Sequence, residues 1–203
     1  MGQDMAENVL DLEIPVLLLA MPQVMDSFFN RSVVLLIHHN EEGSFGFIVN
    51  RPSEIQLADI LQGMEVPWNG ASGAMAFFGG PVQSQLGTVM FGHPDERKLE
   101  MQDPEGLTEV SPGICITQQL GDLGQLAATP PSRFRLLLGY AGWGAGQLVS
   151  EIVRNDWLTA PVQDEFLFAE DPDSVWEKVL DSVGVDPAGL PAWTPDGGDE
   201  PTN

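Results

Sequence analysis

Residues 32–49, SVVLLIHHNEEGSFGFIV, decide the fold of this chain. Residues 32–38 (SVVLLIH) and 44–49 (SFGFIV) are rich in branched and aromatic side chains, which favour strands. The polar connection between them contains Gly43, as is typical of a hairpin loop. The two segments are therefore predicted to pair antiparallel. The continuous apolar run VVLLI further indicates a strand that is covered on both faces.

Other segments of the chain extend this pattern. Strand composition bounded by turn-forming residues occurs at 15–20, 75–78, 86–91, 113–117, 134–140 and 165–168. Helical spacing of apolar residues occurs at 57–64, 118–128, 147–156 and 171–184. Ser53 and Gln56 resemble a capping box for the first of these helices. Runs of strands with few interposed helices predict an α+β fold.

The length of 203 residues fits one domain, which typically has about 150 residues, with short extensions. We expect residues 11–192 to form this domain, and residues 1–10 and the acidic residues 193–203 to be disordered. No apolar run approaches the roughly 20 residues that a membrane-spanning helix needs. A soluble protein without a membrane partner is predicted.

Acidic residues dominate the charge of the chain. There are 30 Asp and Glu residues against 8 Lys and Arg, which gives a net charge of −22. Such a charge opposes attraction to phosphate backbones, so nucleic acid is an unlikely partner. Six of the basic residues fall within residues 31–150, and any anion site is expected there.

Signatures of catalysis are missing from the sequence. Cys115 is the only cysteine and lies in the apolar stretch GICIT, so we expect a buried, inert thiol. His38 and His39 are followed by acidic residues, and His93 stands apart, but neighbouring residues of a strand point to opposite faces. We therefore predict no metal, no cofactor and no catalytic residues. Without a disulfide or a basic leader segment, a cytoplasmic location is expected.

A glycine-rich stretch, GYAGWGAGQ at 139–147, lies between an apolar strand and a predicted helix. Backbone N–H groups at the start of a helix can hold an anion, and glycine lets a ligand approach closely. The alternative is a tight strand-to-helix bend in which Trp143 fills part of the core. Both interpretations remain open at this point.

Four strings together resemble one known family. They are AMPQVMDSFFNRSVVLL at 20–36, GFIVNRP at 46–52, FFGGPVQ at 77–83 and LGYAGWGAGQL at 138–148. Over roughly residues 14–190 the chain is similar to the AlgH/YqgE family of small bacterial proteins. The resemblance implies a single α+β domain of mostly antiparallel, coiled and bifurcated β-sheets with a few flanking helices. It also implies a cytoplasmic location and a transcriptional-regulator label that comes from genetic effects, but no reaction.

The resemblance also suggests which residues form a binding site. Carried over position by position, they are Asn30, Arg31, Asn50, Arg51, Gly79, Gly80, Gly142, Trp143, Gly144, Gly146 and Gln147. Ser27 departs from the family pattern, which has a proline there. Arg31 and Arg51 each follow an asparagine at a strand edge, and we expect both to line one concavity with the glycine-rich turns.

Three functions follow from this interpretation. The first is a non-enzymatic regulatory or interaction protein that acts through a protein partner or a small ligand. The alternative is a small-molecule-binding sensor or enzyme that uses the glycine-rich turn at 139–147 with Arg31 and Arg51. Direct DNA binding comes third because of the charge. If the arginines bind a ligand, Arg31→Ala and Arg51→Ala are predicted to leave the melting temperature nearly unchanged and to abolish ligand-induced stabilisation.

Overall fold

The computed structural model describes residues 11–92 and 106–190, and in these ranges ten strands form one continuous sheet. The strands are β1 (Val16–Ala20), β2 (Val33–Asn40), β3 (Gly43–Ile48), β4 (Pro52–Gln56), β5 (Met75–Phe78), β6 (Val82–Gly92), β7 (Leu107–Ser111), β8 (Ile114–Thr117), β9 (Phe134–Gly144) and β10 (Trp157–Ala160). Their order is β10-β1-β2-β3-β9-β6-β8-β7, and β5 joins β4 to the side of β9. All of these pairs are antiparallel except β5 with β9.

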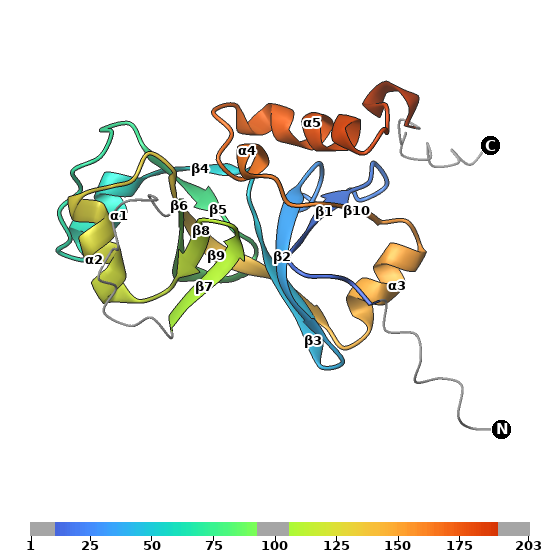
Figure 1. Ribbon diagram of the computed structural model, residues 1–203, viewed down its shortest axis with the longest axis horizontal. Coiled ribbons are helices and arrows are strands. Elements are labelled where there is room, and N and C mark those ends of the chain that lie inside the picture. The colour runs from blue at the N-terminus through green and yellow to red at the C-terminus, as the bar shows by residue number, and fades with distance from the viewer. Residues whose placement is uncertain (1–10, 93–105, 191–203) are drawn as a thin grey trace, which may run out of the picture.

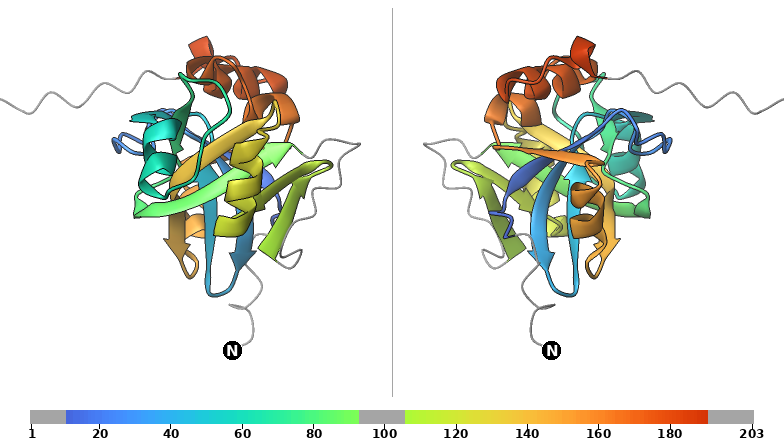
Figure 2. Two further views of the ribbon diagram at one scale, coloured as in Figure 1. Left: turned by 90° about the vertical axis from the view of Figure 1, so that its left-hand side faces the viewer. Right: turned by 90° about the vertical axis from the view of Figure 1, so that its right-hand side faces the viewer.

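Short helices flank the sheet. They are α1 (Leu57–Gly63), α2 (Leu120–Ala128), α3 (Gln147–Val153), α4 (Asp164–Leu167), α5 (Val175–Ser182) and the 3₁₀ turns η2 (Pro172–Ser174) and η3 (Pro187–Gly189). In Figure 1, α1 and α2 lie on one side of the molecule, α3 lies on the other, and α4 and α5 lie across the top. Figure 2 shows the same arrangement from both ends.

Strand β9 is shared by the two halves of the sheet. Its C-terminal end pairs with β3, where Gly46 lies opposite Ala141. Its N-terminal part pairs with β6, where Phe91 lies opposite Phe134. The sheet therefore forks at β9, and the predicted single-domain α+β fold with coiled, bifurcated sheets is confirmed.

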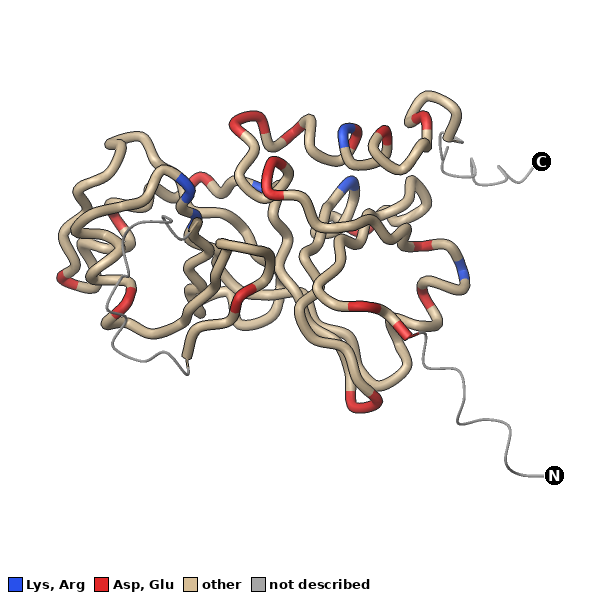
Figure 3. The backbone as a smooth tube through the Cα atoms, in the orientation of Figure 1, with Lys and Arg blue, Asp and Glu red and all other residues tan. Residues whose placement is uncertain are grey.

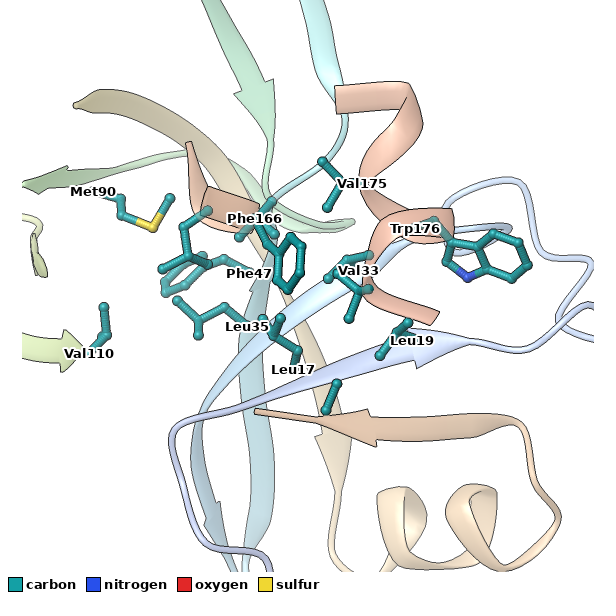
Figure 4. Close-up of a cluster of buried hydrophobic side chains, with 14 of the residues drawn as sticks. Leu17, Leu19, Val33, Leu35, Phe47, Met90, Val110, Phe166, Val175 and Trp176 are labelled. Atoms are coloured by element: carbon teal, nitrogen blue, oxygen red, sulfur yellow. The ribbon is translucent and has the colours of Figure 1, made fainter. Parts of the chain in front are cut away.

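The hairpin predicted from residues 32–49 is confirmed as β2 and β3. Strand β2 is buried on both faces, because alternate side chains point in opposite directions. Val33 and Leu35 join the cluster that lies under α4 and α5, which Figure 4 shows, whereas Val34 and Leu36 join a second cluster around Trp143. This double burial explains the uninterrupted apolar run.

Two local predictions are wrong. Residues 165–168 were expected to form a strand, but Asp164–Leu167 form helix α4, whose first turn carries Asp164 and Glu165. Acidic side chains are favourable at a helix N-terminus, and a short apolar run does not distinguish a buried helix from a strand. The capping box is also not formed, because Pro52–Gln56 are strand β4 and the Ser53 hydroxyl donates to the carbonyl of Ala76 instead.

The predicted helices α1, α2, α3 and the η2–α5 unit are confirmed, and Gly184 ends α5 with a φ of 77°. Strands β4, β7 and β10 were not predicted. The expectations for residues 1–10, 193–203 and His93 lie outside the described residues. No helix in the described ranges is long and apolar enough to span a membrane.

Candidate functional site

Two asparagine–arginine pairs meet where the loop of residues 21–32 packs on the end of β3. The Asn50 side chain accepts a hydrogen bond from the Val33 N–H at 2.8 Å and donates one to the Arg31 carbonyl at 3.0 Å. The Arg51 guanidinium donates to the carbonyls of Ser27 and Asn30, both at 2.7 Å. The structure thus brings Asn30, Arg31, Asn50 and Arg51 together at one junction.

The side chain of Arg31 extends from this junction to helix α5. Its backbone has a positive φ of 53°. Its guanidinium pairs with Glu177 and lies 4.8 Å from the ring centre of Trp176. The side chains of Arg31 and Glu177 are 54% and 52% exposed, so water screens this ion pair. Arg31 therefore remains part of the surface.

Arg31 and Arg51 make different contacts, and this changes the expected stability of the Arg51→Ala variant. We expect Arg51→Ala to lower the free energy of unfolding by about 1–2 kcal/mol, because two loop carbonyls lose a charged donor. That corresponds to roughly 2–8 °C in melting temperature for a chain of this size. Arg31→Ala removes a screened surface ion pair and a contact between its exposed side chain and the Trp176 ring, and is expected to cost about 1 kcal/mol. Thermal unfolding measures both.

Arg154→Ala is the control for these two variants, because Arg154 forms an exposed pair with Asp156. Equal melting temperatures for Arg51→Ala and Arg154→Ala would show that Arg51 does not hold the loop. The sequence-based expectation that both Arg31→Ala and Arg51→Ala leave the melting temperature unchanged is thus retained only for Arg31.

Gly79 and Gly80 lie where the connection between β5 and β6 crosses β9. The Gly79 N–H donates to the Leu138 carbonyl at 2.7 Å, and the Gly79 carbonyl accepts from the Ile48 N–H at 2.8 Å. A Cβ atom at Gly79 or Gly80 would lie closer than 3.0 Å to the backbone of β9. These glycines therefore allow two backbones to approach each other.

The glycine-rich stretch forms a strand end followed by a bend. Trp143 and Gly144 pair with β3, and Gly146 adopts a left-handed conformation with a φ of 70° before α3. The Gly144 N–H donates to the Gln147 side-chain oxygen at 3.1 Å. An anion would have to displace this side chain, so the geometry favours the bend interpretation.

Glu151, which the sequence analysis did not predict as a site residue, accepts hydrogen bonds from three side chains next to this bend. Its carboxylate accepts hydrogen bonds from the indole N–H groups of Trp143 and Trp157, both at 2.8 Å. The Gln147 amide donates to the same carboxylate at 2.9 Å. Phe29, from the loop of residues 21–32, contacts both indole rings. The spacing from Gln147 to Glu151, one helical turn, was the available signal.

A cavity of about 360 Å³ lies beside the glycine-rich end of β9. Gly142, Trp143, Tyr140 and His38 are among its lining residues, whereas neither Arg31 nor Arg51 is. The His38 ring stacks on Phe45, with ring centres 5.2 Å apart. The expected concavity that joins Arg31 and Arg51 to the glycine-rich turn is therefore not this cavity.

Other reactive side chains are engaged in packing. Burial and the nearby Glu109 raise the pKa of the buried Cys115 thiol, which keeps it protonated at neutral pH. His39 forms a hydrogen bond with the Ser44 hydroxyl at 2.7 Å. Within the described ranges, no group of three or more His, Cys, Asp or Glu side chains is arranged to hold a metal ion.

The α+β fold of this chain is also found in solved structures of bacterial proteins. A solution structure of the AlgH protein from Pseudomonas aeruginosa superimposes with a TM-score of 0.69 at 33% identity, covering 89% of this chain and 93% of that one. A crystal structure of a protein from Corynebacterium diphtheriae gives a TM-score of 0.69 at 26% identity, covering 87% and 88%.

Sequence comparison gives the same grouping. The profile of the AlgH-like family matches residues 17–188. A UPF0301 protein from Myxococcus xanthus is 39% identical over 177 residues, covering 87% of this chain and 93% of the relative. A UPF0301 protein from Ruegeria pomeroyi is 38% identical, covering 84% and 91%. The chain belongs to the AlgH-like family, as its four sequence strings indicated.

Proposed function

We propose that this protein is a non-enzymatic regulatory protein of the cytoplasm that acts by binding a protein partner through the loop of residues 21–32. The observation that carries the proposal is the exposure of two large apolar side chains on this firmly held loop. Met25 is 49% exposed and Phe28 is 44% exposed. Arg31, which is half-exposed, lies on the same loop.

The loop is ordered by its own hydrogen bonds as well as by Asn50 and Arg51. Asp26 accepts from the Phe28 N–H at 2.8 Å, and the Asn30 side chain donates to the Val24 carbonyl at 3.3 Å. Phe28 stacks on Phe78 with ring centres 5.6 Å apart. A loop that is already ordered loses little entropy when it binds, which favours affinity.

The residue types on this loop match those of protein interfaces. Aromatic residues, methionine and arginine are enriched there relative to the rest of a protein surface. Figure 3 shows acidic residues on the β2–β3 hairpin tip and along the C-terminal helices. With a net charge of −22, the protein repels nucleic acid, so any regulatory effect is proposed to run through protein contacts rather than direct DNA binding.

Replacing the exposed apolar side chains tests the proposal. We expect the double variant Met25→Ser/Phe28→Ser to reduce recovery of the partner from a cell lysate by at least about tenfold, because truncating the few hot-spot residues of an interface costs about 2 kcal/mol or more. The melting temperature should change by only a few degrees. Quantitative pull-down with the immobilised full-length protein, read by mass spectrometry, measures the recovery.

The matched control is Leu120→Ser/Val153→Ser, since these side chains are 56% and 68% exposed and lie on α2 and at the end of α3. The control should recover the same proteins as the wild type. Equal recovery by both double variants would contradict a docking role for the loop.

The second candidate function is a small-molecule sensor or enzyme, which the cavity beside Gly142 and Trp143 favours. Its lining includes titratable His38 and the phenol of Tyr140. A thermal-shift screen against metabolites and nucleotides separates this candidate from the first. A ligand present at about 100 times its dissociation constant adds about 2.7 kcal/mol of stability. Stabilisation that His38→Ala removes would favour this second function.

A further inference from the structure

In the described residues the forked sheet has three edge strands, β4, β7 and β10, each paired on one side only. Within residues 11–92 and 106–190, β7 pairs only with β8 and β10 pairs only with β1. The unpaired side of an edge strand presents backbone N–H and C=O groups to which a further strand can add. The fold brings the β7 and β10 edges toward each other, because Val110 of β7 shares a buried cluster with Leu17 of β1 and Ala160 of β10.

A cavity of about 730 Å³ lies between the ends of these edge strands. Three segments line it: residues 11–16 leading into β1, residues 109–112 at the end of β7, and residues 159–162 at the end of β10. Ligand pockets in proteins commonly enclose about 300–1,000 Å³. The space is therefore large enough for several side chains of a bound segment.

The lining of this cavity combines apolar and acidic side chains. Leu12, Ile14, Val16, Val110 and Val162 supply apolar surface, together with Pro15, Pro112 and Pro161. The titratable side chains are Asp11, Glu13 and Glu109, and no Lys or Arg lines the cavity. Glu109 also accepts a hydrogen bond from the Gly113 N–H at 3.0 Å. Asp11 and Glu13 are exposed, which leaves their negative charge at the mouth of the cavity.

We propose that the cleft between β7 and β10 binds an extended peptide in which basic and apolar residues alternate. Such a peptide adds as a strand to an open edge, and its alternate side chains point in opposite directions. The apolar side chains then enter the cavity, while the basic ones reach Asp11 and Glu13. This site is separate from the loop of residues 21–32 and does not rest on the function proposed above.

Charge argues against two other occupants of the cleft. A second copy of the protein carries the same net charge of −22, and residues 191–203 contain acidic but no basic residues. Both are repelled by the acidic mouth, whereas a basic peptide is attracted to it at long range. The alternative is that the prolines and acidic side chains here only protect the sheet edges from aggregation. In that case no peptide binds in the cleft.

Fluorescence anisotropy with labelled octapeptides and the full-length protein tests the site. We expect the peptide KVKVKVKV to bind saturably and less tightly as salt is added, and EVEVEVEV not to bind. A basic peptide of equal charge with prolines in place of its two central valines should bind at least about tenfold more weakly, because proline removes the N–H donors of the strand. Absence of saturable KVKVKVKV binding, or equal binding of the proline peptide, would overturn the proposal.

A pair of matched variants separates the cleft from general attraction to an acidic protein. Asp11→Lys/Glu13→Lys is expected to weaken binding by at least about tenfold. Glu41→Lys/Glu42→Lys changes the net charge equally at the tip of the β2–β3 hairpin and should leave the affinity within about twofold. Bound peptide should also slow hydrogen exchange at 107–111 or 157–160 and not at the hairpin tip. Equal losses in both variants, or no slowing at either edge, would place the binding elsewhere.

Discussion

A Gly80→Ala variant is expected to lose more than about 4 kcal/mol of its free energy of unfolding, and the full-length protein should fail to accumulate in folded form at 37 °C. Gly80 is buried and has a φ of 152°. A Cβ atom there would overlap the backbone of Tyr140 and Ala141 on β9 rather than a movable side chain. The clash can be relieved only if the connection between β5 and β6 moves away from the strand that joins both halves of the sheet.

Two controls separate this clash from other effects of replacing glycine. An added Cβ at Gly73 meets nothing within 4 Å, so Gly73→Ala should be close to neutral. Gly113 also has open space but a φ of 75°, so Gly113→Ala measures the cost of a positive φ alone, about 1–2 kcal/mol. Circular dichroism and chemical unfolding compare the three. A Gly80→Ala protein as stable as Gly113→Ala would show that close approach is not what Gly80 provides.

The parts of the fold that could be predicted are those whose buried apolar residues form a regular pattern along the chain. The run VVLLI, buried on both faces of β2, and the stripe of apolar residues in α5 leave clear patterns in the sequence. Strands β7 and β10 could not be predicted, because LTEVS and WLTA are short and mixed in polarity. Edge strands receive less burial than central ones, so their sequences carry less of the pattern.

The predicted binding residues show a similar division. The asparagine–arginine pairs do meet, because Asn50 bridges the ends of β2 and β3 through the backbone of Arg31 and Val33. The directions of their side chains could not be predicted, since Arg51 turns inward to loop carbonyls while Arg31 reaches α5. Contacts between residues so far apart in the chain depend on the completed fold and not on local spacing.

Arg135 is a buried cation that sequence reasoning did not separate from the surface arginines. It lies on β9 and is 6% exposed. Its guanidinium donates to the carbonyl of Val49, after β3, and to the carbonyl of Ala169, after α4, at 2.7 Å in the second case. It also lies 4.0 Å from the ring centre of Phe77 on β5. One side chain thus joins both halves of the sheet and the C-terminal helices.

Burial lowers the pKa of the Arg135 guanidinium to about 10, so the group is still charged at neutral pH. Its pKa in the folded protein lies below that of the unfolded chain, and the unfolded chain binds the proton more tightly. The free energy of unfolding therefore gains no pH dependence from Arg135 below about pH 9 and rises with pH only as the folded pKa is approached. Any effect of removing Arg135 is expected to be constant between pH 6 and 8.

We expect Arg135→Met to lower the free energy of unfolding by about 3 kcal/mol, or roughly 6–12 °C in melting temperature. Methionine fills part of the space and removes the cost of burying a charge, but the buried carbonyl of Val49 and the partly buried carbonyl of Ala169 then lack a donor, and this loss is the larger one. Arg133→Met is the matched control, because Arg133 lies two residues before Arg135 and forms a half-exposed pair with Asp164. This variant should cost at most about 1 kcal/mol. Chemical unfolding at pH 6, 7 and 8 measures both variants. Equal stabilities would mean that the hydrogen bonds of Arg135 to Val49 and Ala169 do not stabilise the fold.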